Sequence, residues 1–345
     1  MTETDLAAAV RGAVGQWMRT TTPAQRQVEL SAAPAALSAT LGLTAGASLT
    51  SQGHGAAVVR AFLLNAPYRH LSRAFDVVSL VDTPTAFFPV PDTDGTDAGR
   101  AAALAVHGLL ELETVSYGSE NDGNLFANLV VMPGDGAFAE KSKGSMRGHT
   151  DAVSFPFNGE DDPQDVRIAP SPDLVTLVGL RNPNGVPTRL MPLADVLPLL
   201  TPADVVELKK AQYSVTAQKT FRQGTRRMLG LEHVVIDAPV LKDSSNGLYV
   251  RYSHSNVTAR VTGGAAQQAA EHLEAACNQV AKPVVVQPGD ILVINNRLAL
   301  HGRGKVGSDV GRQSRWLLRA YALDTSGLHP QKRHPAEAAP HVLFP

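Results

Sequence analysis

Residues 287–319 read QPGDILVINNRLALHGRGKVGSDVGRQSRWLLR, and this stretch decides the fold that the sequence predicts. The runs DILVINN (290–296) and RWLLRAYAL (315–323) are short and apolar, as the buried strands of a β-sheet are. Glycine and polar residues separate the two runs, which indicates a turn. The stretch therefore predicts two strands joined by a polar loop.

Similar strand-like runs recur on the N-terminal side of this stretch. They are NLVVMP (128–133), RGHTDAVSF (147–155), DLVTLVGL (173–180), HVVIDAPVL (233–241), GLYVRYS (247–253) and PVVV (283–286). Two segments with helical periodicity, 202–212 and 264–281, interrupt the series. Many short strands separated by turns favour a β-sandwich or jelly roll over a parallel α/β sheet.

The first hundred residues have a different pattern. Apolar residues at helical spacing predict helices over 7–18, 55–64 and 98–112. We therefore expect an α+β protein with a mainly β core, organised as a single domain over residues 1–345. Residues 1–115 form a mainly helical flanking region, 116–325 the jelly-roll core with helical inserts, and 326–345 a surface tail.

Composition excludes several classes of protein. The 31 Lys and Arg residues balance 32 Asp and Glu residues, without a basic run, which argues against a nucleic-acid partner or an anionic membrane surface. Cys277 is the only cysteine, so neither an internal disulfide nor a cysteine-based zinc site is available. The N-terminus is acidic where a signal peptide is basic, and no apolar run approaches about 18 residues. We expect a soluble cytoplasmic protein, and the sequence makes no prediction of its oligomeric state.

Three residues form the candidate metal site. His149 and Asp151 belong to the predicted strand 147–155, where side chains two residues apart face the same side. His301 follows another strand and can reach the same point. Two imidazoles and one carboxylate form the facial triad that binds Fe(II) and leaves positions open for substrate and O2.

Two arginines follow this triad in the sequence. We expect the strand that begins at Arg315 to return beside the strand of His301, so that the Arg315 guanidinium holds a dicarboxylate by two hydrogen bonds. Arg319, four residues further on, is expected on the same face. It would share this task or bind a substrate carboxylate.

The pattern GD…NNR…HGR…RWLLR in 287–319 resembles the distal part of Fe(II)/2-oxoglutarate-dependent oxygenases. The similarity is to the clavaminate-synthase-like branch of the taurine dioxygenase superfamily, whose members hydroxylate amino acids. The segment SMRGHTDAVSFPF (145–157) matches the proximal part, and residues 117–133 match the strand before it. The resemblance covers about residues 115–325 and implies a double-stranded β-helix core.

This resemblance also implies roles for individual residues. His149, Asp151 and His301 would bind Fe(II), and Arg315 would bind the 5-carboxylate of 2-oxoglutarate, with O2 as the second co-substrate. The residues implied in substrate binding are Glu120, Asn121, Arg251, Ser253 and His254. Asp151 stands where many amino-acid hydroxylases of this branch have a glutamate, so the substrate is not fixed by the resemblance.

The implied activity is hydroxylation of an unactivated carbon in an amino acid or an amino-acid-derived metabolite, with release of succinate and CO2. Two alternatives remain open at this point. The same iron chemistry can give desaturation or cyclisation of a specialised metabolite. A non-catalytic jelly roll that binds a small molecule is the alternative from a different class, although such a module has no need for His149, Asp151, His301 and Arg315 together.

Overall fold

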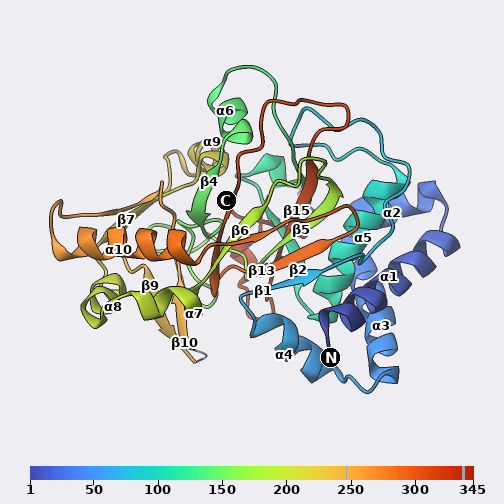
Figure 1. The fold of residues 1–345 in the computed structure, drawn as a ribbon, viewed down its shortest axis with the longest axis horizontal. Coiled ribbons are helices and arrows are strands. Elements are labelled where there is room, and N and C mark those ends of the chain that lie inside the picture. Colours follow the sequence, from blue (N-terminus) through green and yellow to red (C-terminus); the bar gives the residue numbers. More distant parts are fainter. Residues whose placement is uncertain (246, 336–338) are drawn as a thin grey trace.

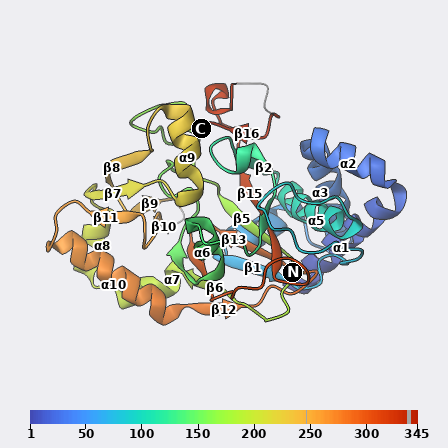
Figure 2. The ribbon, with the colours of Figure 1, turned by 90° about the horizontal axis from the view of Figure 1, so that it is seen from above.

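The computed structural model describes residues 1–245, 247–335 and 339–345. Its described part has four β-sheets, and the two largest face each other, with helices on the outer face of each (Figures 1 and 2). Apolar side chains from both sheets, among them Leu177, Leu190 and Leu317, pack into one cluster between them. The expected α+β class with a mainly β core and a helical N-terminal region agrees with this arrangement.

The N-terminal helices cover the larger sheet. They are α1 (Glu3–Thr20), α2 (Pro23–Ala32), α3 (Pro34–Ser51), α4 (Ala56–Leu64) and α5 (Asp94–Leu109). Threonine side chains cap the N-termini of α1, α2 and α5 by accepting a backbone hydrogen bond. The predictions of α1, α4 and α5 are confirmed. Helices α2 and α3 were not predicted. In α3, small residues lie on every side of the helix, so the sequence shows no distinct apolar stripe.

The larger sheet has seven strands in the described part of the chain. Their order is β1 (Tyr68–Leu71), β13 (Ile291–Asn295), β5 (Leu174–Arg181), β15 (Trp316–Leu323), β2 (Glu113–Tyr117) and β16 (Val342–Leu343), with β3 (Ala127–Leu129) also paired to β15. Side chains of β15 alternate between the faces: Trp316 and Leu318 pack against the helices, whereas Leu317 and Tyr321 face the second sheet. This alternation also directs Arg319 toward the space between the sheets.

The smaller sheet has the order β12 (Lys282–Val284), β6 (Thr188–Pro192), β14 (Ala299–Arg303) and β4 (Met146–His149). On its outer face, Met191 and Leu300 pack into a cluster with Leu273 and Cys277 of helix α10 (Ala265–Val280). The remaining elements in this region are α7 (Leu193–Val196), α8 (Pro202–Lys209), β7 (Tyr213–Thr216), α9 (Lys219–Leu229), β8 (Val234–Ala238), β9 (Leu241–Ser244), β10 (Gly247–Val250) and β11 (Val257–Ala259). The helices predicted over 202–212 and 264–281 are confirmed.

Three predictions about the strands are wrong. The single strand predicted over 233–241 is instead β8 and the start of β9, which belong to different small sheets. The strand predicted over 147–155 ends at His149, and residues 151–154 form a turn. The strand after His301 does not return beside it, because β15 lies in the larger sheet while β14 lies in the smaller one. The polar loop between β14 and β15 therefore crosses from one sheet to the other.

The predicted surface tail also differs from the structure at its end. Val342, Leu343 and Phe344 are buried, and β16 pairs in parallel with β2. Residues 336–338 of the tail lie outside the described residues. The last residues of the chain thus contribute to the core, because their apolar side chains lose contact with water there.

Among the described residues, no single helix has both the length and the apolar composition of a membrane span. Helices α2 and α3 meet such a criterion only as a pair, and the pair is bent by 109°.

Candidate metal centre

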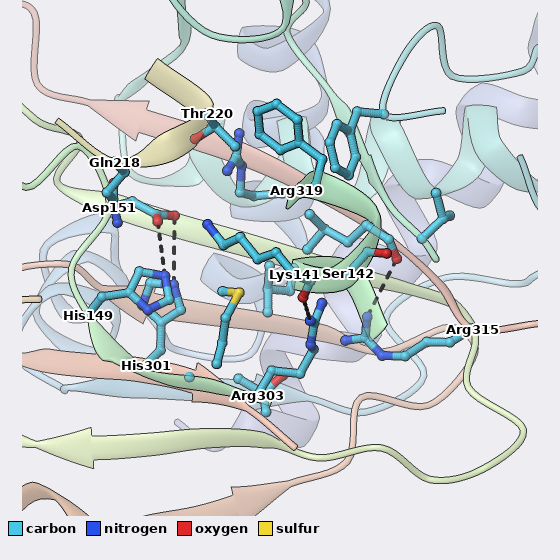
Figure 3. Close-up of a pocket in the computed structure, with 18 residues that line it drawn as sticks. Lys141, Ser142, His149, Asp151, Gln218, Thr220, His301, Arg303, Arg315 and Arg319 are labelled. Carbon is cyan, nitrogen blue, oxygen red and sulfur yellow. Dashed lines mark hydrogen bonds and ion pairs between the residues drawn. The ribbon is translucent and has the colours of Figure 1, made fainter. Parts of the chain in front are cut away.

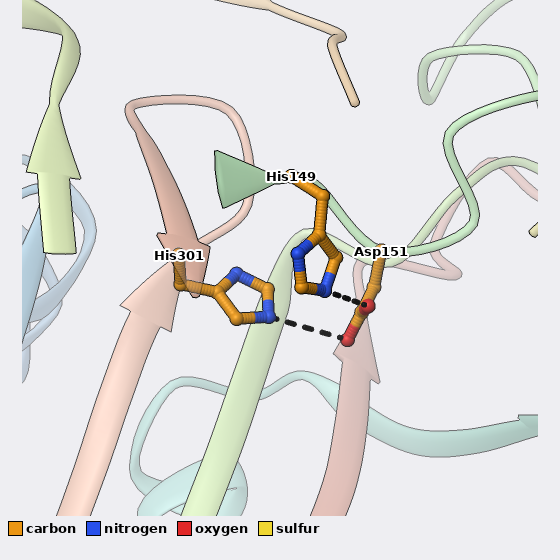
Figure 4. Close-up of side chains that lie close together, drawn as sticks. All are labelled: His149, Asp151 and His301. Carbon is orange, nitrogen blue, oxygen red and sulfur yellow. Dashed lines mark ion pairs between the residues drawn. The ribbon is translucent and has the colours of Figure 1, made fainter. Parts of the chain in front are cut away.

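The three residues of the predicted triad lie together (Figure 4). His149 ends β4 and His301 lies directly opposite it on β14, so the ring centroids are 4.4 Å apart. Oδ1 of Asp151 is 3.4 Å from Nε2 of His149, and Oδ2 is 3.7 Å from Nε2 of His301. One ligand atom from each residue lies within 4.8 Å of the others. These nitrogen and oxygen donors are the set that a divalent iron ion accepts.

Asp151 reaches this position through a turn and not through strand alternation. Ala152, the next residue, has a φ of +52°. The side chain of Gln218 holds the turn: its Oε1 accepts a hydrogen bond from the Ala152 N–H at 2.8 Å, and its Nε2 donates to the Thr150 carbonyl at 3.1 Å. Asn296 similarly bonds the backbone N–H and carbonyl of Asp151. Two amide side chains from distant segments therefore position the carboxylate.

The two imidazoles are suited to bind a metal through Nε2. Nδ1 of His149 lies 3.0 Å from the carbonyl oxygen of Arg147, which can only accept, so Nδ1 is the donor and Nε2 is the ring nitrogen left for a metal ion. Burial lowers the pKa of His301 to about 3, so its ring is neutral near neutral pH. Its Nδ1 is buried and has no hydrogen-bond partner among the described residues.

The Asp151 carboxyl complements these rings. Burial acts to raise its pKa, but the neighbouring His301, His149 and Arg319 outweigh burial and hold the pKa well below the usual range. The group is therefore an ionised carboxylate. A neutral imidazole, as in His301, and an ionised carboxylate, as in Asp151, are protonation states that a metal ion requires of its ligands.

A cavity of about 120 Å³ lies beside the triad between the two sheets (Figure 3). Side chains of both sheets line it, together with residues of helix α6 (Ala137–Lys143), which lies over it. Four of the lining side chains are cationic, namely Lys141, Arg303, Arg315 and Arg319, whereas Asp151 is the one lining carboxylate among the described residues. The cavity is thus strongly biased toward anionic ligands.

Arg315 is buried in this cavity without an acidic partner in the described part of the chain. Its side chain is 5% exposed, its Nη1 lies 3.5 Å from the carbonyl oxygen of Leu129, and its Nε has no partner there. Burial and the nearby charge of Arg303 lower the pKa of Arg315 to about 9. A buried guanidinium without a carboxylate is costly unless a ligand supplies the anion.

Arg319 has a different environment from Arg315. Its Nη2 donates to Oε2 of Glu120 at 2.6 Å, and the Tyr321 hydroxyl lies 3.2 Å from the same oxygen. Burial acts to lower the pKa of Arg319, but the Glu120 carboxylate outweighs burial and raises it. In Figure 3 the two arginines enter the cavity from different sides, with Arg319 nearer to Asp151.

None of the five residues with an implied substrate role is among those that line this cavity. Glu120 is buried against Arg319, and Asn121 begins the short helical turn that follows it. Arg251 is buried and lies over the Phe157 ring, 5.3 Å from its centroid.

The other two lie behind the metal site. Ser253 forms a backbone bridge with His149, and its hydroxyl lies 3.2 Å from Oδ1 of Asn256. His254 is buried, with Nδ1 3.4 Å from a carboxylate oxygen of Glu274. Both residues support the strand that carries His149.

The sequence analysis did not find several residues of the site. Gln218, which precedes α9, and Thr220, in its first turn, line the cavity, as do Lys141 and Ser142 of α6. No motif marks them, because each comes from a segment whose position depends on the rest of the fold. Asn296 belongs to the NNR pattern, which was the one available signal for it.

Comparison with known proteins agrees with this geometry. Residues 168–321 match the family described as Taurine catabolism dioxygenase TauD, TfdA family, so the predicted resemblance is confirmed over this segment. The matched segment contains His301, Arg315 and Arg319, whereas His149 and Asp151 precede it. No curated protein matches the chain in sequence.

Solved structures match almost the whole chain. An asparagine oxygenase in complex with Fe(II), 2S,3S-3-hydroxyasparagine and succinate has a TM-score of 0.75 at 21% identity, over 99% of this chain and 97% of its own. The non-heme iron oxygenase OrfP in complex with Fe and L-Arg has a TM-score of 0.72 at 20% identity, over 98% and 97%. OrfP with Fe, succinate and (3R,4R)-dihydroxy-L-Arg gives 0.70 at 19% identity, over the same shares. The chain therefore has the fold of these oxygenases.

Proposed function

We propose that this protein is an Fe(II)- and 2-oxoglutarate-dependent oxygenase that hydroxylates an unactivated carbon of an amino acid or amino-acid derivative. Succinate and CO2 are the co-products. The observation that carries this proposal is a single cavity that contains both the His–Asp–His cluster and the buried guanidinium of Arg315. No carboxylate among the described residues pairs with this guanidinium. The similar asparagine oxygenase and OrfP, solved with iron, succinate and hydroxylated amino acids, support it.

The proposed core of this enzyme is a double-stranded β-helix formed by the two facing sheets. The apolar cluster between the sheets and the similarity to oxygenases over nearly the whole chain support this assignment. We further propose one oxygenase domain over residues 1–345, with residues 1–115 as the helical flank and 116–325 as the core. The flank covers the outer face of the larger sheet, which leaves the inner face free for the site.

We propose that Nε2 of His149, Nε2 of His301 and the Asp151 carboxylate hold the iron. When bound, the iron together with 2-oxoglutarate and O2 supplies the oxidation of a C–H bond. The protein contributes fixed geometry. The Arg147 carbonyl sets the tautomer of His149, and the Gln218 amide holds the turn that carries Asp151.

Arg315 is the proposed partner of the 5-carboxylate of 2-oxoglutarate. It can offer two parallel N–H donors to a carboxylate, and its burial strengthens that interaction. Arg319 is proposed to orient the substrate through a substrate carboxylate. Glu120 would then act as a positioning residue, because it fixes the Arg319 guanidinium.

The other residues that the resemblance implies in substrate binding do not line the cavity. They are proposed to act indirectly, by supporting the backbone that carries His149 and Asp151. Ser253 and His254 lie beside the strand that ends at His149, and Arg251 lies near the turn that follows it. Above the cavity, the rings of Phe87 and Phe138 meet edge to face at 6.2 Å. This apolar cover would exclude water from the reacting groups.

The direct test is anaerobic addition of Fe(II) and 2-oxoglutarate to the metal-free protein. We expect a weak visible charge-transfer band, and His149→Ala should abolish it. His272→Ala is the matched control, because His272 also belongs to a His-x-acid triplet but is half exposed on α10 and contacts Asp204. A missing band in the wild-type protein, or an undiminished band in the His149 variant, would contradict the proposed iron site.

Turnover is tested next by supplying O2 and a panel of amino acids. We expect succinate release that depends on one of them, and a product that has gained one oxygen atom. A product that has lost two hydrogen atoms would instead indicate desaturation or cyclisation. A protein that binds small molecules without forming succinate would belong to the non-catalytic class.

A further inference from the structure

Lys141 presents a cationic group to the cavity that the proposed chemistry does not use. It lies near the C-terminal end of α6, and its side chain runs along the cavity toward Asp151 and Arg319 (Figure 3). Among the described residues, none accepts a hydrogen bond or forms an ion pair with its ammonium group. Burial lowers the pKa of Lys141, and the carboxylates of Asp151 and Glu120 oppose this shift without cancelling it.

The neighbouring lysine on the same helix shows the contrast. The Lys143 ammonium donates to the Gly134 carbonyl at 2.9 Å and to Glu140 at 3.2 Å, outside the cavity. The backbone of Lys141, in turn, accepts a hydrogen bond from Arg303 at 2.8 Å, and this bond fixes α6 over the cavity. The helix backbone is therefore anchored at Lys141, whereas the charge of its side chain is not neutralised by this contact.

The charges around the cavity leave an excess of positive charge. The two positive charges of the iron cancel the two negative charges of 2-oxoglutarate. Four cationic side chains line the cavity, and the carboxylates beside them are Asp151, which also lines it, and Glu120, which pairs with Arg319. Two positive charges then remain when a zwitterionic substrate without a charged side chain is bound. Buried charges that lack a partner are costly, so an anionic substrate is favoured.

Each of the other three cations has a partner, either in the structure or in the proposed complex with 2-oxoglutarate. Arg319 contacts Glu120, Arg303 contacts the backbone carbonyls of Lys141 and Gly144, and Arg315 is assigned to 2-oxoglutarate. The remaining free cation among the described lining residues is Lys141.

We propose that Lys141 binds a carboxylate in the side chain of the substrate, so that the enzyme acts on acidic amino acids or their derivatives in preference to the corresponding amides. This inference rests on the proposed oxygenase function and specifies its substrate class. The Arg319–Glu120 pair would meet the main-chain groups of the substrate, and Lys141 would meet its acidic end. Discrimination comes from one charge-assisted hydrogen bond that an amide cannot replace with equal strength.

The test measures binding without turnover. Calorimetric titrations are carried out without O2 on protein loaded with Fe(II) and 2-oxoglutarate, using the pairs L-aspartate and L-asparagine, L-glutamate and L-glutamine, and their N-acetyl derivatives. We expect the wild-type protein to bind at least one acid more tightly than its amide, by about tenfold or more. Lys141→Gln should weaken binding of that acid by about 10- to 100-fold and change binding of the amide by less than about threefold.

Two further variants make the result specific. Lys141→Arg retains the positive charge and should keep the preference for the acid. Lys143→Gln removes the same charge from the same helix outside the cavity and should leave both ligands unaffected. Loss of 2-oxoglutarate binding in Lys141→Gln, equal losses for acid and amide, a wild-type preference for the amide, or no binding of any acid would each overturn the inference. If the wild-type protein shows no visible charge-transfer band with Fe(II) and 2-oxoglutarate, the proposed function itself is overturned. The two failures are therefore distinguishable.

Discussion

The side-chain amide of Asn296 forms hydrogen bonds with both the backbone N–H and the backbone carbonyl of Asp151. Its Oδ1 accepts a hydrogen bond from the Asp151 N–H at 2.8 Å, and its Nδ2 donates to the Asp151 carbonyl at 3.0 Å. The same Nδ2 donates to the carbonyl of Pro172 at 3.0 Å. Asn296 follows β13 of the larger sheet, whereas His149 belongs to the smaller one. The amide therefore fixes the carboxylate of the site relative to both sheets.

Asn296→Ala should weaken iron binding by about 10- to 100-fold, because the turn that carries Asp151 loses its support. It should also lower the free energy of unfolding by about 1–3 kcal/mol, since buried backbone groups are left unpaired. Iron affinity is measured by titration of the metal-free protein, and stability by urea unfolding of the same sample.

Asn295→Ala is the matched control for this prediction. Its amide bonds the Leu64 carbonyl and the Arg297 N–H, and it does not contact Asp151. We expect a similar loss of stability with nearly unchanged iron affinity. Equal losses of iron affinity in both variants would show that the effect comes from general destabilisation.

Arg315→Met should raise the dissociation constant of 2-oxoglutarate by about 100-fold or more, because it removes a buried, charge-assisted contact. Arg315→Lys retains the charge but loses the two-pronged geometry, so we expect an intermediate increase. The visible band, titrated with 2-oxoglutarate at saturating Fe(II), gives these constants. Lys305→Met removes an exposed cation from the preceding loop and should have no effect. Unchanged 2-oxoglutarate affinity in Arg315→Met would rule out its assigned role.

His107 should make the stability of the protein depend on pH. Its ring is fully buried on α5, with Nδ1 and Nε2 each 2.8 Å from a threonine hydroxyl, of Thr114 and Thr176. Burial lowers the pKa of His107 to about 3, below the value of about 6.5 in an unfolded chain. Between these values the unfolded state binds more protons, so stability falls as the pH falls from about 6.5 toward 3.

The expected slope for His107 is about 1.4 kcal/mol per pH unit within that window. Urea unfolding of the metal-free protein at several pH values measures it. His107→Gln should destabilise the protein near neutral pH, and the gap to the wild type should narrow as the pH falls. His329→Gln changes an exposed histidine and should leave the slope unchanged. A constant gap for His107→Gln would show that its ring does not resist protonation.

Phe344, next to the last residue, should be important for folding. Its side chain is 4% exposed, and its backbone bonds Lys332 and Ala169. Phe344→Ala should cost about 3–5 kcal/mol in the free energy of unfolding, because it leaves a cavity in the core between the sheets. Leu231→Ala shortens an exposed side chain and should change stability by less than about 0.5 kcal/mol. If Phe344→Ala lowers the free energy of unfolding by no more than Leu231→Ala does, the end of the chain is not part of the core.

Local patterns predicted much of the fold. The apolar runs that become β5, β13 and β15 are recognisable because both faces of these strands are buried, against helices on one side and the second sheet on the other. Helices α1 and α5 follow from their apolar spacing. The end of β4 at His149 was not predictable, since GHTDAVSF has the composition of a strand throughout and only contacts to distant residues stop it.

The sequence by itself determined the candidate residues for the proposed chemistry: His149, Asp151, His301 and Arg315 are the residue types that such a site needs, in a recognisable order. Only the tertiary structure decided how they meet. Asp151 is held by amides from distant segments, β15 crosses to the other sheet, and α6 brings Lys141 into the cavity. The physical reason is that side-chain type is a local property, whereas hydrogen bonds to a turn and the charge balance of a cavity depend on residues that only folding brings together.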